Sequence, residues 1–250
     1  MPLLSVQNLS KHFGGLHAVE DVSFNVEPGE RLAIIGPNGA GKTTLFELLS
    51  GTLLPSRGRI HAFGKEITTW AAHRRVSLGI GRTFQITNLF FNLTVLDNLL
   101  LALGTEGAVR FDLLRPMSSY HRLYEKGREI LNRWNLWERR NVPVRSLSYG
   151  EQRLLEITLT LSQDRPLLLL DEPTCGLSPD EAKNFVSMIR SFPRDITILL
   201  IDHDMDVVSE IAERIMVLHF GRVMALGPPE EVRRNPRVQE IYTGRGYEPA

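Results

Sequence analysis

The sequence predicts an α/β fold built on a parallel sheet, with a helical segment inserted near the middle of the chain. Two short and almost wholly apolar runs, Leu167–Leu170 and Thr197–Ile201, are typical of strands buried on both faces. A stretch with helical signals follows each run, which is the alternation expected of a parallel sheet. Between about Thr94 and Trp137, helical periods dominate and strand signals are few.

The N-terminal region is expected to supply several strands and one helix. Apolar residues either alternate with polar ones or run together in four stretches, namely Leu3–Val6, Val22–Val26, Arg31–Ile35 and Arg59–Phe63. Gly14–Gly15 supplies a turn between the first two strands. From Thr43 onward leucines recur at a helical spacing, which predicts a helix directly after a glycine-rich loop.

The rest of the chain continues the pattern. Helices are expected over Tyr120–Trp134, from Gly150 to about Leu161, from Ser178, over Val207–Ala212 and from Gly227. The helix at Ser178 has a strong start, because Pro179 occupies its first turn and Glu181 completes a capping box. A hairpin is expected over Arg214–Leu218 and Arg222–Ala225.

The composition excludes several classes of protein. The 250 residues suit one large domain or two small ones. Lys plus Arg (29) balance Asp plus Glu (29), whereas a general nucleic-acid binder should carry a basic excess, so no nucleic-acid partner is expected. Local basic patches remain possible at Arg74–Arg75, Arg139–Arg140 and Arg233–Arg234, although solvated surface charge is the simpler explanation for each pair.

Cysteine usage and hydropathy exclude several kinds of site and segment. Cys175 is the single cysteine, which excludes an internal disulfide and a zinc site made of cysteines. The N-terminus lacks the pattern of a signal peptide, and the longest apolar runs are far shorter than the ~20 residues of a membrane-spanning helix. If the protein works at a membrane, another chain is expected to span it.

The segment Gly36-Pro37-Asn38-Gly39-Ala40-Gly41-Lys42-Thr43 matches the phosphate-binding pattern GxxxxGK(S/T). A buried strand precedes it and a helix follows it, as that pattern requires. The glycines let backbone N–H groups surround phosphate oxygens, and the helix N-terminus adds partial positive charge. Lys42 can reach the β- and γ-phosphates of a nucleotide, and the Thr43 hydroxyl can ligate Mg²⁺.

Two acidic residues follow the apolar run at Leu167–Leu170. Parallel strands deliver such side chains to the edge of the sheet where ligands bind. Asp171 is expected to hold the metal through water, and Glu172 to polarise a water molecule for in-line attack on the γ-phosphate. A second anion site is indicated at Ser148 and Gly150, because they open a helix and present a hydroxyl and free N–H groups.

With these motifs in order, the chain resembles the ATP-binding subunits of ATP-binding-cassette (ABC) transporters. Leu147–Glu151 is similar to the family signature LSGGQ, and Cys175–Ser178 to the D-loop. The resemblance implies that Phe13 stacks on adenine, that Gln85 touches Mg²⁺ and the attacking water, and that His203 contacts the γ-phosphate.

The resemblance completes the predicted sites for the cofactors ATP and Mg²⁺. Predicted ATP contacts are Phe13, Gly36, Pro37, Asn38, Gly39, Ala40, Gly41, Lys42, Thr43, Thr44, Ser148 and Gly150. Predicted metal ligands are Thr43, Gln85 and Asp171. Predicted catalytic residues are Glu172, His203, Gln85 and Lys42.

A fold and an assembly are also implied by the resemblance. One domain over 1–250 is expected, with a P-loop α/β core and an antiparallel β edge at about 1–92 and 150–250, and a helical subdomain at about 93–149. A second ATPase subunit, identical or paralogous, would clamp each ATP against the signature. Two membrane permease subunits would dock beside Asn88–Asn92, and an external solute-binding protein would deliver the solute. The chain would work at the cytoplasmic face of the inner (plasma) membrane.

Within the family, several segments resemble the branched-chain (hydrophobic) amino-acid importers, among them FGGLHAVEDVSF and NPRVQEIYTG. Three residues depart from the general motifs, since Tyr149 and Glu151 replace Gly and Gln in the signature and Ser178 replaces a common D-loop Asp. Urea importers and lipopolysaccharide-type exporters share much of this pattern. A small-molecule kinase, a non-transport ABC ATPase and a non-enzymatic nucleotide switch are alternatives with less support.

Overall fold

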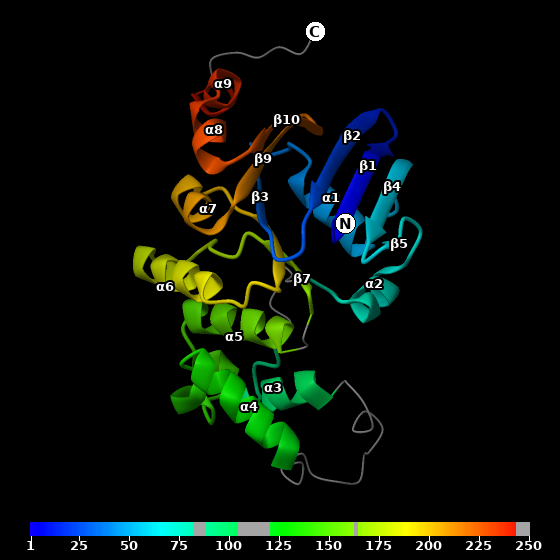
Figure 1. Cartoon of the computed structure of the whole chain (residues 1–250). Helices are drawn as coiled ribbons and strands as arrows, with labels where there is room; N and C mark the ends of the chain where they lie inside the picture. Colours follow the sequence, from blue (N-terminus) through cyan, green and yellow to red (C-terminus); the bar gives the residue numbers. More distant parts are fainter. Residues whose placement is uncertain (83–88, 105–120, 163–164, 244–250) are drawn as a thin grey trace. The chain divides into compact units, whose positions relative to one another are not determined.

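The computed structural model in Figure 1 describes four stretches of the chain: residues 1–82, 89–104, 121–162 and 165–243. It divides into two compact units. The first unit consists of Met1–Arg82, Pro166–Cys175 and Ile189–Ala250, and the second of Thr83–Arg165 and Gly176–Met188. The second unit is therefore built from two separate segments of the chain.

A mixed six-stranded sheet organises the first unit, in the order β10-β9-β3-β8-β7-β6. Its strands are β3 (Arg31–Ile35), β6 (Ile80–Arg82), β7 (Leu167–Asp171), β8 (Thr197–Ile201), β9 (Arg214–His219) and β10 (Arg222–Gly227). All neighbours are parallel except the β9–β10 hairpin. Every residue of β3, β7 and β8 is buried, which confirms the parallel-sheet prediction and its apolar strands.

An antiparallel four-stranded sheet, in the order β2-β1-β4-β5, lies at the edge of the first unit (Figure 1). Its strands are β1 (Leu4–Phe13), β2 (Leu16–Val26), β4 (Arg57–Ala62) and β5 (Lys65–Glu66). The first two strands are longer than predicted because bulges interrupt the alternation without ending the pairing. Gly14–Gly15 forms the predicted turn between them.

Helix α1 (Lys42–Ser50) joins both sheets in one apolar core. The core contains Leu45, Phe46, Leu48 and Leu49 of this helix together with buried residues of β1–β4 and β7–β9. The other described helices of this unit are α2 (Ala72–Leu78), α7 (Met205–Ile211), α8 (Pro229–Arg234) and α9 (Pro236–Thr243). Sequence reasoning missed α2, β5, β6 and α9, all of which are short.

Arg75 is not a surface charge, which corrects the interpretation of the Arg74–Arg75 pair. The side chain is fully buried, and its guanidinium donates to the carbonyls of Leu48 at 2.6 Å and Leu49 at 2.9 Å. These carbonyls end α1, where backbone acceptors lack helical partners. Burial lowers the pKa of Arg75 to about 10. Arg75 therefore closes the C-terminus of the helix that begins at the phosphate loop.

The second unit is helical. It contains α3 (Val95–Gly104), α4 (His121–Arg133), α5 (Tyr149–Leu161) and the short 3-10 turns at Trp137–Arg139 and Val144–Ser146. Its core gathers α3, Leu131 of α4 and Leu155 of α5 around Leu136 and Val144. This packing places α5 in the helical unit, beyond the expected bounds of 93–149. Helix α6 (Pro179–Arg190) begins in this unit.

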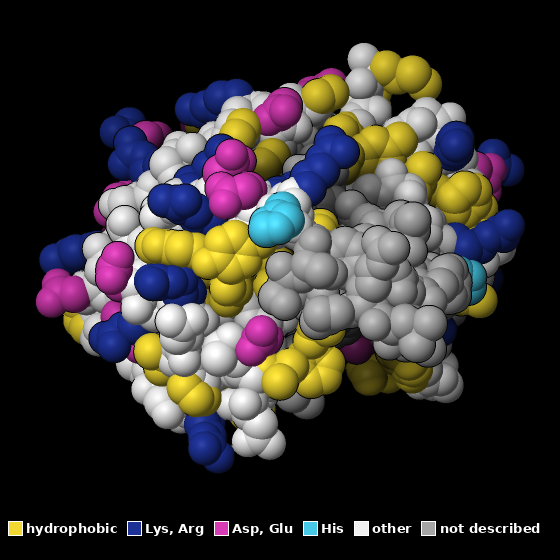
Figure 2. All heavy atoms as spheres, turned by 90° about the horizontal axis from the view of Figure 1, so that it is seen from below, with side chains coloured by type: hydrophobic (Ala, Val, Ile, Leu, Met, Phe, Trp, Pro, Cys, Tyr) yellow, Lys and Arg dark blue, Asp and Glu magenta, His cyan; other side chains and the backbone are white. Residues whose placement is uncertain are grey.

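None of the described helices is long and apolar enough to cross a membrane. Figure 2 shows Lys and Arg side chains scattered over one face of the molecule among acidic and apolar ones, rather than gathered in one patch.

Candidate nucleotide-binding site

The predicted chemistry lies at the ends of three neighbouring strands. The loop Gly36–Thr43 follows β3, His203 comes just after β8, and Asp171 and Glu172 stand at the end of β7. These strands are adjacent and parallel in the order β3-β8-β7. Their carboxyl ends therefore share one edge of the sheet, which is where open α/β sheets bind ligands.

Two glycines of the phosphate loop are required by its backbone. Gly36 has φ 149° and Gly41 has φ 98°, values that L side chains rarely adopt. A Cβ at either position would lie 2.2 Å from a carbonyl oxygen, that of Leu218 for Gly36 and that of Ala18 for Gly41. At Gly39 a Cβ would meet nothing within 4 Å, although its φ of 79° also lies in the region that L side chains rarely adopt. Close approach of β9 and β2 thus explains the outer two glycines.

The remaining loop residues differ in accessibility. Asn38 and Thr43 are exposed, Pro37 and Thr44 are half-buried, and Ala40 is buried. The Thr43 hydroxyl is therefore accessible in the first turn of α1. Exposed polar groups in this turn are suitably placed to contact a nucleotide.

Lys42 is held inside the loop. Its side chain is buried, and Nζ donates to the carbonyl oxygens of Gly36 at 2.7 Å and Pro37 at 3.0 Å. Burial lowers the pKa of Lys42, while the charges of Glu172 and Asp171 act in the opposite direction. The structure thus brings the predicted lysine within electrostatic range of both predicted acids.

Asp171 forms an ion pair that sequence reasoning missed. Arg82 Nη2 lies 3.0 Å from its Oδ2, and the two side chains are 10% and 1% exposed. Arg82 Nη1 also donates to Ser50 Oγ at 3.1 Å, at the end of α1. Nothing in the sequence around Arg82 signals this pairing, because its partner is distant in the chain. Gln85, the predicted metal ligand nearby in sequence, lies outside the described residues.

The described residues fit a magnesium ion in their chemistry. Mg²⁺ prefers oxygen ligands, few of them from protein and the rest from water and phosphate. The Thr43 hydroxyl and the Asp171 carboxylate are oxygen donors at the same edge of the sheet. The ion would supply positive charge to the phosphates.

Glu172 has a strained backbone. Its φ is +46°, in the left-handed region that a residue with a Cβ adopts only at a cost. Its N–H donates to the carbonyl of Ile201 at 2.8 Å, which extends the pairing of β7 and β8 by one residue. Such outliers persist where the surrounding structure enforces them, and they concentrate at functional sites.

His203 is presented by a buried aspartate. Asp202 is fully buried, and its Oδ1 accepts from the N–H groups of His203 at 2.8 Å and Asp204 at 3.1 Å. Its Oδ2 accepts from the Thr174 hydroxyl at 2.6 Å, which ties this turn to the segment after Glu172. The His203 side chain is 67% exposed and is free to reach a ligand.

Phe13 ends β1 with a half-exposed ring. Lys11 Nζ lies 5.1 Å from the ring centroid, within range of a cation–π contact. An exposed aromatic ring of this kind is suited to stacking on a base.

Ser148 and Gly150 belong to the second unit, where they open α5. The predicted helix start is confirmed as a capping box. Ser148 N–H donates to Glu151 Oε2 at 2.8 Å, and Ser148 Oγ accepts from Glu151 N–H at 3.2 Å. Arg139 Nε lies 3.0 Å from Glu151 Oε1. A Cβ on Gly150 would lie 2.1 Å from Glu181 Oε1, so glycine also lets α5 approach α6 closely.

The predicted capping box at the start of α6 is also present. Ser178 N–H donates to Glu181 Oε2 at 2.9 Å, and Glu181 N–H donates to Ser178 Oγ at 3.4 Å. Tyr149, which departs from the family signature, packs beside Gly176, where a Cβ would lie 3.0 Å from its ring. The thiol of Cys175 is exposed rather than buried.

Tyr242 of α9 contacts the phosphate loop, which sequence reasoning did not anticipate. Partial burial raises the pKa of Tyr242, and a backbone hydrogen bond from Gly36 offsets part of that rise. The C-terminal helix therefore reaches the same loop that holds Lys42.

Comparison with known proteins agrees with this geometry. Residues 19–175 match a family model described as "ABC transporter", and residues 222–248 match one described as "Branched-chain amino acid ATP-binding cassette transporter". The chain is 38% identical to the high-affinity branched-chain amino acid transport ATP-binding protein BraF of Pseudomonas aeruginosa, over 97% of this chain and 98% of BraF. LivG of Escherichia coli, of the same description, is also 38% identical over 97% and 98% of the two chains.

A solved structure shares the fold. The ADP conformation of MJ1267, an ATP-binding cassette of an ABC transporter, superposes with a TM-score of 0.86 at 30% identity. The match covers 98% of this chain and 99% of MJ1267. The chain therefore belongs to the ABC transporter family, as an ATP-binding subunit that hydrolyses ATP to drive transport, in the group that contains LivG and BraF.

Proposed function

We propose that this subunit powers the import of branched-chain or other hydrophobic amino acids. The observation that carries the proposal is the C-terminal match over residues 222–248, because that model describes branched-chain amino acid cassettes in particular. The near-full-length identity to BraF and LivG supports it.

The roles proposed for the site residues follow from the match of their motifs to those of the ABC transporter family. Phe13 stacks on adenine, and the loop N–H groups with Lys42 hold the phosphates. Thr43, Asp171 and Gln85 hold Mg²⁺, whose charge favours attack at the γ-phosphate. Glu172 accepts the proton of the attacking water, and neither the lysine nor the metal can replace it in this role because both are cationic.

His203 and Gln85 complete the catalytic set in this proposal. The His203 ring is exposed on a turn whose backbone N–H groups are fixed by Asp202. It contacts the γ-phosphate, and Gln85 orients the water. The buried aspartate supports the proposal because a fixed turn presents the imidazole with little loss of conformational entropy on binding.

We further propose that two ATPase subunits, identical or paralogous, clamp each ATP between one phosphate loop and the other subunit's Ser148 and Gly150. Both anion sites in this chain begin helices, α1 and α5, but they belong to different units. Binding in trans accounts for a chain that carries two such sites. Glu151 anchors the Ser148 N–H, so the backbone of the signature is fixed before the partner arrives.

The same proposal locates the chain at the cytoplasmic face of the inner membrane, docked on two permease subunits. An external solute-binding protein delivers the solute to those permease subunits. Phe90 and Phe91 belong to the predicted docking segment Asn88–Asn92, and as exposed aromatics they suit contact with an apolar partner. We retain the description of 1–250 as one cassette with a core and a helical insertion.

A hydrolysis-deficient variant tests the dimer. Glu172→Gln should bind Mg-ATP, hydrolyse it very slowly, and elute as a dimer with Mg-ATP and as a monomer without nucleotide. Glu210→Gln, which alters an exposed carboxylate on α7, is the matched control and should hydrolyse ATP at the wild-type rate. A variant that stays monomeric with Mg-ATP even after mixing with a paralogous subunit would contradict the clamp.

The transported solute is tested in cells that lack this gene. Uptake of radiolabelled leucine, isoleucine and valine should be lost and then restored by the wild-type chain but not by Glu172→Gln. Unchanged uptake of all three in the deletion strain would remove the amino-acid proposal while leaving the ATPase assignment in place.

A further inference from the structure

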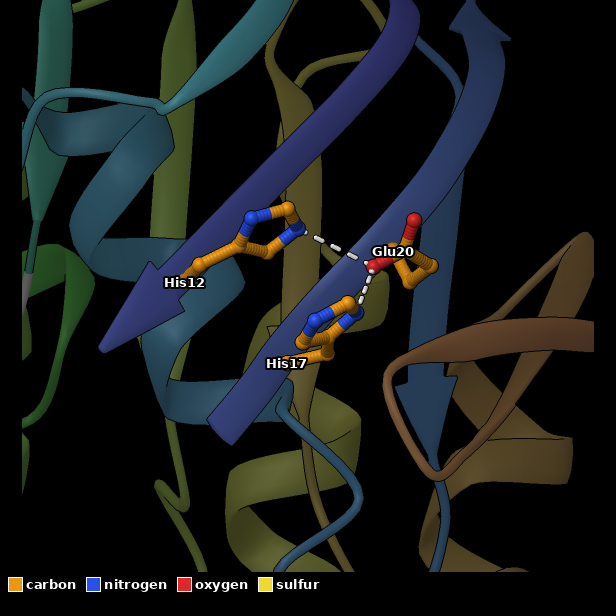
Figure 3. Close-up of side chains that lie close together, drawn as sticks. All are labelled: His12, His17 and Glu20. Atoms are coloured by element: carbon orange, nitrogen blue, oxygen red, sulfur yellow. Dashed lines mark hydrogen bonds and ion pairs between the residues drawn. The ribbon is translucent and has the colours of Figure 1, made fainter. Parts of the chain in front are cut away.

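Two histidines and one glutamate meet on the β1–β2 hairpin, outside the residues assigned to the nucleotide. Figure 3 shows the side chains of His12, His17 and Glu20 turned toward one another, with both rings directed at the same carboxylate oxygen. His12 Nε2 lies 3.0 Å and His17 Nδ1 lies 2.5 Å from Glu20 Oε2. One ligand atom from each residue lies within 4.8 Å of the others.

The three side chains form an organised cluster. The two rings stack with centroids 4.1 Å apart and an angle of 18° between their planes. His12 and His17 are direct cross-strand partners, so the antiparallel pairing itself brings their rings together. Among the described residues, no other set of three His, Cys, Asp or Glu side chains lies this close together.

The backbone around the cluster is anchored on both strands. His12 N–H donates to Ser56 Oγ at 3.1 Å, and Glu20 N–H donates to the carbonyl of Gly221 at 2.8 Å. Ligands on paired strands with fixed backbones need little reorganisation when an ion binds. The side chains keep 25%, 56% and 22% exposure for His12, His17 and Glu20, which leaves an open path from solvent.

The donor set matches a known class of ion. Zn²⁺ binds imidazole nitrogen and carboxylate oxygen at roughly 2.0–2.2 Å, and ligand atoms on a tetrahedral ion are then roughly 3.3 Å apart. The nitrogen–oxygen separations of 3.0 and 2.5 Å require only a small expansion. Burial raises the pKa of the Glu20 carboxyl, but hydrogen bonds from His17 and His12 lower it overall.

The geometry points to a binding site for one divalent transition-metal ion of the zinc class, held by His12 Nε2, His17 Nδ1 and Glu20, with the remaining position open to water. When the ion binds, the ring nitrogens that now face the carboxylate become its ligands, and each neutral imidazole carries its proton on its other nitrogen. The ion joins β1 to β2 directly behind the hairpin turn at Gly14–Gly15.

A pair elsewhere in the same sheet serves as the control. His61 Nε2 lies 3.9 Å from Glu66 Oε2 across β4 and β5, but none of the residues that the structure describes adds a third ligand there. Two ligands bind an ion far more weakly than three, so His61→Gln should leave zinc binding unchanged. The exposed Cys175 thiol is a competing ligand, and all measurements therefore use a Cys175→Ser background.

The test is a titration of metal-free protein with Zn²⁺ in competition with a chromophoric chelator. One ion should bind per chain, and His17→Gln and Glu20→Gln should each weaken that binding by about 100-fold, since even changes to outer-shell partners cost 10–100-fold. Zn²⁺ should also raise the melting temperature of the parent chain but not of these variants.

Three results would overturn the proposal: a parent chain that binds no ion, a His17→Gln chain that binds one with parental affinity, or equal weakening by His61→Gln. Cobalt gives an independent readout, because the parent complex should show the visible absorption of a four-coordinate ion. If His17→Gln does not fold, as judged by circular dichroism, Glu20→Gln provides the same test.

Discussion

Replacing Arg82 by Gln should destabilise the first unit by removing the guanidinium that pairs with the buried Asp171 carboxylate. The two groups lie 3.0 Å apart, with side-chain exposures of 10% and 1%. Breaking a buried ion pair from one side costs about 3–5 kcal/mol, because the remaining charge loses its compensation. Lys42, which interacts electrostatically with Asp171, should hold the cost near the lower end, at about 3 kcal/mol.

Arg82→Gln also loses the hydrogen bond to Ser50 Oγ, worth about 1 kcal/mol. Urea unfolding should therefore shift its midpoint down by roughly 1 M relative to the wild type. Ser50→Ala measures the smaller contribution alone. The double variant Arg82→Gln/Asp171→Asn removes both charges and should be more stable than Arg82→Gln. The loss of stability in Asp171→Asn alone is measured as well. If the losses of Arg82→Gln and Asp171→Asn simply added in the double variant, the ion-pair reasoning would be refuted.

Three further outcomes are expected. Lys42→Ala should weaken ATP binding by at least about 10-fold, as a charge-assisted contact worth about 1.5–3 kcal/mol is lost, and a nucleotide titration with unchanged affinity would contradict the phosphate-loop role. Phe13→Ala should raise the Michaelis constant for ATP with little change in maximal rate, because stacking is similar in the ground and transition states; steady-state kinetics with the opposite pattern would exclude this role. Cys175, which is exposed, should react with a thiol reagent in the nucleotide-free chain and be protected in Glu172→Gln with Mg-ATP, whereas equal labelling in both states would place it away from the dimer interface.

Short-range signals were sufficient for much of the fold. The strands Arg31–Ile35 and Thr197–Ile201 have the predicted bounds, because strands buried on both faces are almost wholly apolar and stand out from the residues around them. The capping box at Ser178 was predicted as such, whereas at Ser148 only the start of the helix was predicted. In a capping box both partners lie within four residues, so the sequence contains the whole interaction.

Interactions over long sequence distances could not be predicted in this way. Arg74 and Arg75 are identical neighbours in the sequence, yet Arg74 is exposed and Arg75 is fully buried against carbonyls at the end of α1. Arg82 and Tyr242 likewise reach Asp171 and the phosphate loop from distant segments. These contacts depend on tertiary packing, for which neither residue type nor spacing carries a signal.

Glu172 shows how the sheet adds to what a motif specifies. The motif names a carboxylate after an apolar strand, but the position of that carboxylate depends on a left-handed φ of +46°. Such a conformation costs about 1–3 kcal/mol. The bond from Glu172 N–H to Ile201 holds it, since it continues the register of β7 on β8. Glutamine carries the same Cβ, so Glu172→Gln retains the strain, and its free energy of unfolding should be close to that of the wild type. A loss of hydrolysis at unchanged stability would then report the chemistry of the carboxylate itself, whereas a large loss of stability would show that the carboxylate also holds the turn.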